Sequence, residues 1–448
     1  MKEHSHVTGL GIFYSIIAAF GGLLFGYFTG IISGPMLFID QDMTLKPFQE
    51  ELIVSTVLIG ALIAAWCGGF FTDRFGRKFS LMTSCVLFIV GNFFLTFANG
   101  VTELIVGRFI SGFGVGLVSM TVPMYIAEMS PAKYRGMFVS FNQLAVVIGI
   151  LFAFSISYAL SLSGNWRGMF AWGFFPCILF LLGLFFIPET PAFLVSKGRG
   201  DKAKHLLKKI RPAESFETIF HKEAKITHAH EVKWAHLFDP NVKKAIFVGI
   251  GISIFQQITG INIVFYYAPK IFEMAGFSGA PSATLATFGL GVVNVIMTIV
   301  ALWLLDKAGR KPLLVIGVAG MALSLIALGL TFLMNDGVAV DIMAIISLMF
   351  YVSFFAFSLG PIAWLIISEI YPLSIRGRAM GLATFSNWLM NYIVSLSFLS
   401  LVGWIGSGGT FLLYAAITIL ALWFIIKKVP ETKGKSLLAI QQYWHKQD

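Results

Sequence analysis

Twelve long apolar segments constrain this 448-residue chain more than any other feature of its sequence. A transmembrane helix needs about 20 consecutive, mostly apolar residues. In a bilayer, only helices or closed barrels satisfy every backbone polar group. The sequence therefore predicts an all-α membrane protein with twelve transmembrane helices, at about 10–33, 52–72, 79–98, 103–127, 137–160, 167–187, 245–269, 283–305, 312–334, 341–368, 378–402 and 408–427.

Charged residues make up only 12% of the chain, against about 25% in an ordinary soluble domain. This excludes a soluble enzyme, a disordered chain and a disulfide-stapled secreted domain. Cys67, Cys85 and Cys177 all lie inside apolar segments, where they are expected to be packing groups. We therefore expect no metal site and no cofactor. The first apolar segment is too long for a signal peptide, so it is expected to remain in the protein.

The basic residues predict the orientation in the membrane. If the N-terminus is inside, 28 of the 32 Lys and Arg residues fall on the inner side. Only Lys46, Arg167 and Lys270 fall outside, and Arg108 lies within a span. Because basic loops stay in the cytoplasm, both termini are predicted to be cytoplasmic in a multi-pass protein of the cell membrane. The net charge of +10 then reflects orientation, and no nucleic-acid partner is expected.

The chain divides into two similar halves. We expect a six-helix half at 1–187, a cytoplasmic linker with short helices at 188–244, a second six-helix half at 245–427 and a cytoplasmic tail at 428–448. The segment 73–78, Asp-Arg-Phe-Gly-Arg-Lys, recurs at 306–311 as Asp-Lys-Ala-Gly-Arg-Lys, an offset of 233. Pro-Glu-Thr follows each half, at 188–190 and 430–432. Parallel six-helix repeats are typical of major facilitator transporters, which bind substrate between the halves.

Charged residues at matching ends of the spans form acid–base pairs in both halves. We predict that they latch the halves together on the cytoplasmic side when the protein opens outward, and separate when it opens inward. The alternative is that they are ordinary loop charges, since an exposed pair contributes only about 0–1 kcal/mol. The predicted latch residues are Asp73, Arg77, Glu128, Arg135, Glu189, Asp306, Arg310, Glu369, Arg376 and Glu431.

Several motifs together resemble the sugar porter family of the major facilitator superfamily, which includes bacterial sugar–proton symporters and human facilitative glucose transporters. The motifs are Gly-Gly-Leu-Leu-Phe-Gly-Tyr at 21–27, the segment 73–78, Pro-Met-Tyr-Ile-Ala-Glu at 123–128, Gln-Gln at 256–257 through Tyr-Tyr at 266–267, Gly-Pro-Ile-Ala-Trp at 360–364 and Pro-Glu-Thr-Lys-Gly at 430–434. The resemblance covers nearly the whole chain. It implies a sugar transporter, not an enzyme, that works by alternating access.

Amide and indole side chains inside the apolar segments are the candidate sugar site. Amides both donate and accept hydrogen bonds, as sugar hydroxyls do, and an indole can stack on the apolar face of a pyranose. The alternative is that these amides only tie helices together. In sugar porters the matching positions contact the sugar. The candidates are Gln143, Gln256, Gln257, Asn262, Asn294, Trp364, Asn387 and Trp388.

The family resemblance also identifies a coupling position. Proton-coupled sugar porters carry an aspartate after the Gly-Tyr of the first span, facing an arginine in the fourth. Here the arginine is Arg108, but the aspartate is replaced by Phe28. Every Asp and Glu lies in a tail, a loop or the end turn of a span, and every His lies in a tail or the linker. The charge of Arg108 is expected to be stabilised by backbone carbonyls, water, nearby hydroxyls or a cation–π contact with Phe28.

These observations predict a monomeric uniporter. Ile150 is apolar, as in human glucose transporters, where the bacterial xylose symporter has an amide, and this favours a glucose-like hexose. Two alternatives remain open: a proton symporter that uses another acid, such as Glu128 or Glu369, and a membrane sugar sensor that hardly transports.

Overall fold

The computed structural model describes residues 8–131, 134–211, 240–277, 279–334, 338–371 and 376–433. All regular structure in these ranges is helical, as predicted. We call α1 to α8 the first half. Its helices are α1 Gly9–Gly30, α2 Ser33–Met43, α3 Pro47–Phe75, α4 Arg77–Thr96, α5 Val101–Met129, α6 Arg135–Ser161, α7 Trp166–Ala171 and α8 Phe174–Phe186.

Two short helices, α9 Pro191–Ser196 and α10 Gly200–Ile210, follow the first half. We call α12 to α18 the second half. Its helices are α12 Pro240–Ile258, α13 Ile261–Met274, α14 Ala280–Ala308, α15 Arg310–Thr331, α16 Val338–Phe357, α17 Leu359–Ile370 and α18 Arg376–Lys428.

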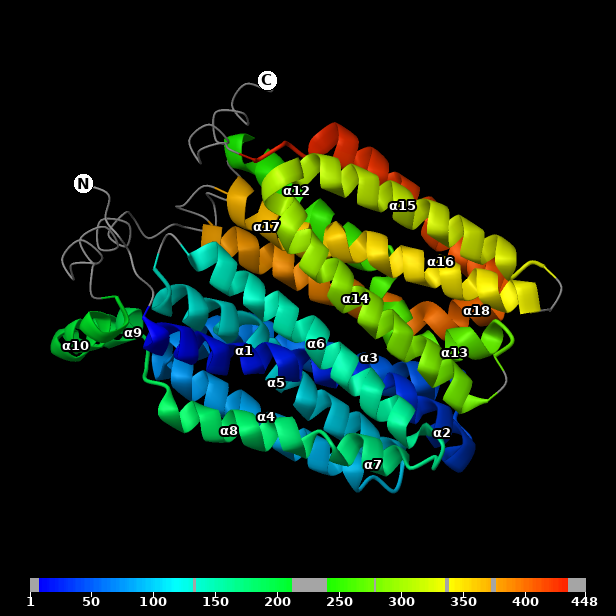
Figure 1. Cartoon of the computed structure of the whole chain (residues 1–448), viewed down its shortest axis with the longest axis horizontal. Coiled ribbons are helices and arrows are strands. Elements are labelled where there is room, and N and C mark those ends of the chain that lie inside the picture. The colour runs from blue at the N-terminus through cyan, green and yellow to red at the C-terminus, as the bar shows by residue number, and fades with distance from the viewer. Residues whose placement is uncertain are drawn as a thin grey trace.

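The two halves lie side by side as two helical bundles (Figure 1). They meet where α3 packs against α18 and where α6 packs against α14. We call the end of the bundle at which α1 begins and α18 finishes the terminal side. The short helices α9 and α10 lie at this end (Figure 1). The other end, where α2 packs against α13, is called the opposite side.

The described residues contain eleven helical segments long and apolar enough to span a membrane, one fewer than the sequence predicts. The difference arises in α18, which covers both of the last two predicted spans. Gly406 interrupts it with a non-helical conformation (φ 74°, ψ 166°) that residues with a Cβ atom rarely adopt. The last two predicted spans are therefore present, and they meet at a glycine without an intervening loop.

Two other helices are broken in the middle of the second half. Gly260, at φ 95°, separates α12 from α13. Ser358, with φ −122° and ψ −98°, separates α16 from α17. A break in a membrane helix leaves backbone groups without helical partners, so side chains are needed to satisfy them. Polar side chains are therefore expected next to these two breaks.

Candidate functional site

Four of the predicted amides form one hydrogen-bonded chain in the second half. Asn387 of α18 donates through Nδ2 to Gln256 Oε1 at 2.7 Å. Gln257 donates through Nε2 to Asn387 Oδ1 at 3.1 Å, and Asn262 donates through Nδ2 to Gln257 Oε1 at 2.6 Å. The structure thus brings Gln256, Gln257, Asn262 and Asn387 together.

The helix breaks anchor this amide chain. Gln256 lies near the end of α12 and donates to the carbonyls of Leu359 (2.9 Å) and Gly360 (3.2 Å), which begin α17. Asn387 also donates to the carbonyl of Ser253 at 3.1 Å. One end of the chain is therefore fixed to backbone. The other end, Asn262, is only half-buried at the start of α13 and can exchange its partners with a ligand.

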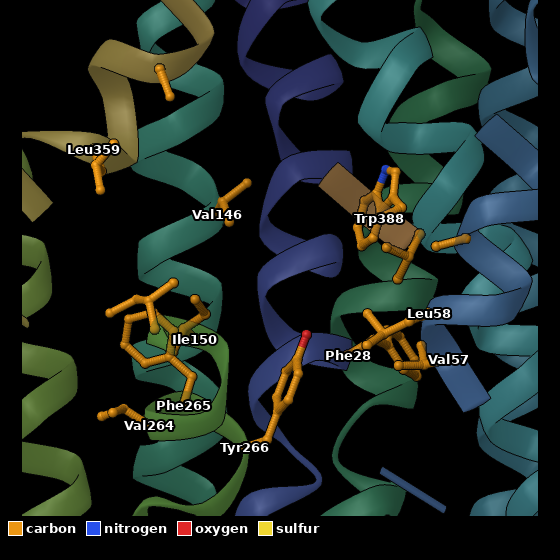
Figure 2. Close-up of a cluster of buried hydrophobic side chains, with 14 of the residues drawn as sticks. Phe28, Val57, Leu58, Val146, Ile150, Val264, Phe265, Tyr266, Leu359 and Trp388 are labelled. Atoms are coloured by element: carbon orange, nitrogen blue, oxygen red, sulfur yellow. The ribbon is translucent and has the colours of Figure 1, made fainter. Parts of the chain in front are cut away.

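Trp388 lies beside the amide chain with an unsatisfied donor. The residue is 6% exposed, and its ring contacts the ring of Phe25 in the first half, with centroids 5.8 Å apart. Figure 2 shows the rings of Trp388 and Tyr266 in a largely apolar cluster that includes Phe28 and Ile150. Trp388 Nε1 is buried without a hydrogen-bond partner. A buried donor of this kind is costly unless something else accepts from it, so Nε1 can serve a hydroxyl ligand.

The structure does not tie the other predicted residues into the amide chain. Gln143 is half-buried on α6, and Asn294 is buried on α14, the helix that packs against α6. Neither forms a hydrogen bond to the chain within the described residues. Trp364 is 37% exposed on α17. These three remain predicted sugar contacts.

A second polar group lies one turn further along α18, and the sequence analysis missed it. Asn391 donates through Nδ2 to the hydroxyl of Tyr266 at 3.4 Å, and Ser395 donates to Asn391 Oδ1 at 3.2 Å. Asn391 is 3% exposed. Residues four apart share one face of a helix, so the spacing from Asn387 was a usable signal.

Arg108 is fully buried and is held by backbone carbonyls. Its guanidinium donates to the carbonyls of Phe28 (2.7 Å), Val54 (3.2 Å) and Ile53 (3.3 Å). The ring of Phe28 instead stacks on Phe88, with centroids 4.6 Å apart. Among the described residues no cation–π contact joins Arg108 to Phe28. Of the expected ways to stabilise this charge, the carbonyls are the one observed.

Charged clusters occupy the terminal side of both halves. In the first half, Arg77 pairs with Glu128 at 2.9 Å and with Asp73 at 3.3 Å. In the second half, Arg310 pairs with Glu369 at 3.1 Å. Each described pair joins helices of one half only, so it stabilises that half and does not connect the two halves. The side chains of three predicted latch residues lie outside the described part of the chain: Arg135, Asp306 and Arg376.

The two Pro-Glu-Thr glutamates cap helices in the same way. Glu189 accepts from the backbone N–H groups of Arg77 (3.0 Å) and Lys78 (3.2 Å), which begin α4. Glu431 accepts from those of Arg310 (3.1 Å) and Lys311 (3.0 Å), which begin α15. A carboxylate at a helix N-terminus satisfies free N–H groups and complements the helix dipole. The repeated motif therefore builds one helix cap in each half.

The caps differ electrostatically although their geometry matches. Burial raises the pKa of the Glu189 carboxyl above its usual range, in spite of its backbone hydrogen bonds. Burial pushes the pKa of Glu431 in the same direction, but backbone N–H groups, chiefly those of Lys433 and Arg310, outweigh it and lower that pKa. Glu431 is therefore the more stable anion of the two.

Two further acids are buried where the halves meet on the opposite side. Glu50 is 4% exposed and Glu51 is fully buried, both in the first turns of α3. Glu50 forms an ion pair with Lys270 of α13. Glu51 accepts from the backbone N–H (2.7 Å) and the hydroxyl (2.8 Å) of Ser400 in α18. Their position in an end turn agrees with the sequence, but their burial was not predicted.

Sequence comparisons with known proteins match nearly the whole chain. A family model described as "Sugar (and other) transporter" matches residues 14–444. The chain is 39% identical to a D-xylose transporter of Levilactobacillus brevis over 443 residues, covering 97% of this chain and 95% of the relative.

Solved structures of the xylose transporter XylE from E. coli match the fold. A partially occluded, inward-open form has a TM-score of 0.84 and 34% identity, covering 96% of this chain and all of the other. A second structure, the proton:xylose symporter XylE bound to 6-bromo-6-deoxy-D-glucose, has a TM-score of 0.79 and 35% identity, covering 98% of this chain and all of the other. The paired bundles are thus the major facilitator fold, and the chain belongs to the sugar porter family as a multi-pass membrane transporter of sugars.

Proposed function

We propose that the protein is a uniporter for a glucose-like monosaccharide, working in the cell membrane as a monomer with both termini in the cytoplasm. The sugar binds to the amide chain and Trp388, and the first half contributes Gln143. Asn294 and Trp364 complete the proposed site from α14 and α17. The two halves then rock around the sugar to expose it to one side of the membrane at a time.

The observation that supports uniport is the surroundings of Arg108. The three carbonyls that stabilise its charge cannot bind or release protons, and the side chain at the aspartate position is the phenyl ring of Phe28. Arginine itself keeps its proton at physiological pH. The coupling position therefore lacks a group that alternates between charged and neutral forms.

The test is uptake into proteoliposomes with and without an imposed pH gradient. Uniport predicts equilibration of labelled glucose without accumulation, at the same final level in both conditions. Xylose, arabinose and galactose in a counterflow competition panel identify the preferred sugar. Uphill uptake that collapses with a protonophore would refute uniport, and a pentose preference would refute the glucose assignment.

A matched variant makes the transport test sharper. Phe28→Asp restores the acid of the symporter pattern beside Arg108, whereas Phe28→Leu changes the size of the side chain without adding charge. Only the aspartate variant is expected to respond to the pH gradient. Equal responses of both variants would show that this position does not control coupling.

Proton symport is the second candidate. XylE, which resembles this chain along nearly its whole length, is described as a proton:xylose symporter. The buried carboxylates Glu50 and Glu51 offer titratable groups at the junction of the halves, outside the coupling position. Under this alternative, Glu51→Gln abolishes uphill uptake but leaves counterflow intact.

Two variants test the proposed binding site. Gln257→Ala and Asn262→Ala each remove a link of the amide chain, so sugar binding is expected to weaken by about tenfold per lost hydrogen bond. Thr418→Ala is a matched control, because Thr418 is buried in the same half and, among the described residues, donates within α18 to the carbonyl of Tyr414. Unchanged affinity in both amide variants would move the site elsewhere.

A further inference from the structure

Contacts between the halves close the opposite side of the bundle. The Glu50–Lys270 ion pair joins α3 to α13, and the Glu51–Ser400 hydrogen bonds join α3 to α18. At the terminal side, every described ion pair stays within one half. The structure is therefore closed at the opposite side by a polar contact that must break when this side opens.

Closure also gathers acids around Lys270. Asp40 of α2 and Glu51 lie close enough to Glu50 to repel its charge. Asp40 also repels Glu273, which lies three residues after Lys270 on α13. Lys270 attracts both Glu50 and Glu273. Lys270 thus pairs with Glu50, attracts Glu273 and lines the same cavity as Asp40, so carboxylates from three helices lie around one ammonium group.

The burial of Glu50 and the cavity beside it make this charge balance important for the closed state. Asp40, Lys270 and Glu273 line a cavity of about 100 Å³ between α2 and α13. The carboxylate of Glu50 is almost fully buried, so water screens it poorly when the halves are together. When the halves separate, water reaches these groups and their mutual repulsion falls. The closed state therefore depends on the positive charge more than the open state does.

We propose that Lys270 is the counterion that holds the opposite side shut, by neutralising an acid cluster of Asp40, Glu50 and Glu273 that closure creates. Lys270 then neutralises several carboxylates and not only Glu50, with which it forms an ion pair. A cluster and a single ion pair predict different labelling rates when charged side chains are replaced. The proposal rests on alternating access, but it holds for a uniporter and for a symporter.

The measurement is the opening of the opposite side, reported by a cysteine in the cavity. Ser33 lines the cavity and is 2% exposed in the closed structure. Ser33→Cys is made with Cys67→Ser, which leaves only the buried Cys85 and Cys177. The rate of reaction with a neutral, water-soluble maleimide then reports the open fraction. It requires neither sugar nor a proton gradient, so its outcome is independent of the uniport test.

Lys270→Met is expected to raise the labelling rate about tenfold, which corresponds to about 1.4 kcal/mol in the closing equilibrium. Lys270→Arg keeps the charge and is expected to label at the parent rate. Lys46→Met is the matched control, because Lys46 is an exposed lysine at the start of α3 on the same side. Its removal is expected to leave the rate unchanged.

Second-site variants separate the cluster from a simple pair. In the cluster, adding Glu50→Gln to Lys270→Met removes one uncompensated anion, so the double variant labels several-fold more slowly than Lys270→Met alone. Asp40→Asn, which keeps the Oδ1 acceptor for Leu45 N–H, should slow labelling below the parent rate. A simple pair also predicts slower labelling of the double variant, because Lys270→Met leaves the buried Glu50 carboxylate unpaired. It predicts no effect of Asp40→Asn, so a parent labelling rate in Asp40→Asn would overturn the proposal.

Discussion

The close approach of α1 and α6 gives a prediction whose size follows from the coordinates. A Cβ atom on Gly26 would lie 1.9 Å from the carbonyl oxygen of Val146, and a Cβ on Gly149 would lie 2.0 Å from that of Leu23. A carbon atom approaches an oxygen to about 3.3 Å at best. Gly26→Ala therefore forces α1 and α6 apart by about 1.4 Å, because backbone atoms cannot rotate out of the way.

The energetic cost follows from the lost packing. A gap of about 0.5–1 Å already forfeits a quarter to a half of the dispersion energy of the atoms that line it. Overpacking usually costs about 1–3 kcal/mol, and a clash with rigid backbone belongs at the upper end. We expect Gly26→Ala to destabilise the protein by about 3 kcal/mol, which lowers the melting temperature of a chain this long by about 3 °C.

Thermal unfolding of the purified protein in detergent measures this effect. Gly381→Ala is the matched control, because Gly381 is helical in α18 and has no atom within 4 Å of its Cβ position. It is expected to stabilise by about 0.5–1 kcal/mol through helix propensity. If Gly26→Ala melts at the parent temperature, or if the two variants melt alike, the inferred contact between α1 and α6 is wrong.

Three further predictions follow from the caps and the site. Because the pKa of Glu431 is lowered, its charge stabilises the fold above the unfolded pKa of about 4.3, and this contribution disappears as the pH falls through the lower folded pKa. Glu431→Gln should therefore destabilise less at pH 3 than at pH 7. The raised pKa of Glu189 instead makes its charge costly at pH 7, so Glu189→Gln should be neutral or stabilising there in melting curves. An equal loss in both variants at pH 7 would contradict this. Trp388→Phe removes a buried N–H without a partner, so melting should be unchanged while sugar affinity, measured by calorimetry, falls about fivefold; unchanged affinity would exclude Nε1 as a sugar donor. Gly76→Ala should lower the melting temperature more than Gly309→Ala, since both glycines have positive φ but a Cβ on Gly76 lies 2.2 Å from Glu189 and one on Gly309 lies 3.0 Å from Glu431; the reverse order would argue against the cap geometry.

Much of the fold could be predicted because a bilayer leaves few alternatives to apolar helices. The length of each apolar segment located the spans, and the repeated charged segments predicted two halves. Gly406 shows the limit of this reasoning. Whether a glycine between two apolar segments makes a loop or a bend within one helical run depends on local backbone geometry, which composition does not specify.

The proximity of Gln257 and Asn262 was predictable because these residues lie close in sequence. Glu50 and Glu51 were harder, because an acid in the first turn of a membrane helix usually faces water. Their burial results from the second half covering that turn, through Lys270 and Ser400. Such a long-range contact leaves no periodic signal along the chain.

Because Gly260 separates α13 from α12, α13 is a short helix that carries Asn262 near its start and Lys270 near its end. Asn262 lies at one end, in contact with the amide chain, and Lys270 lies eight residues further on, about 12 Å away at 1.5 Å per residue. A helix that tilts at one end displaces its other end. In the proposed mechanism, the sugar contact Asn262 and the counterion Lys270 lie on the same helix, so a tilt of α13 on sugar binding would displace the ammonium group of Lys270.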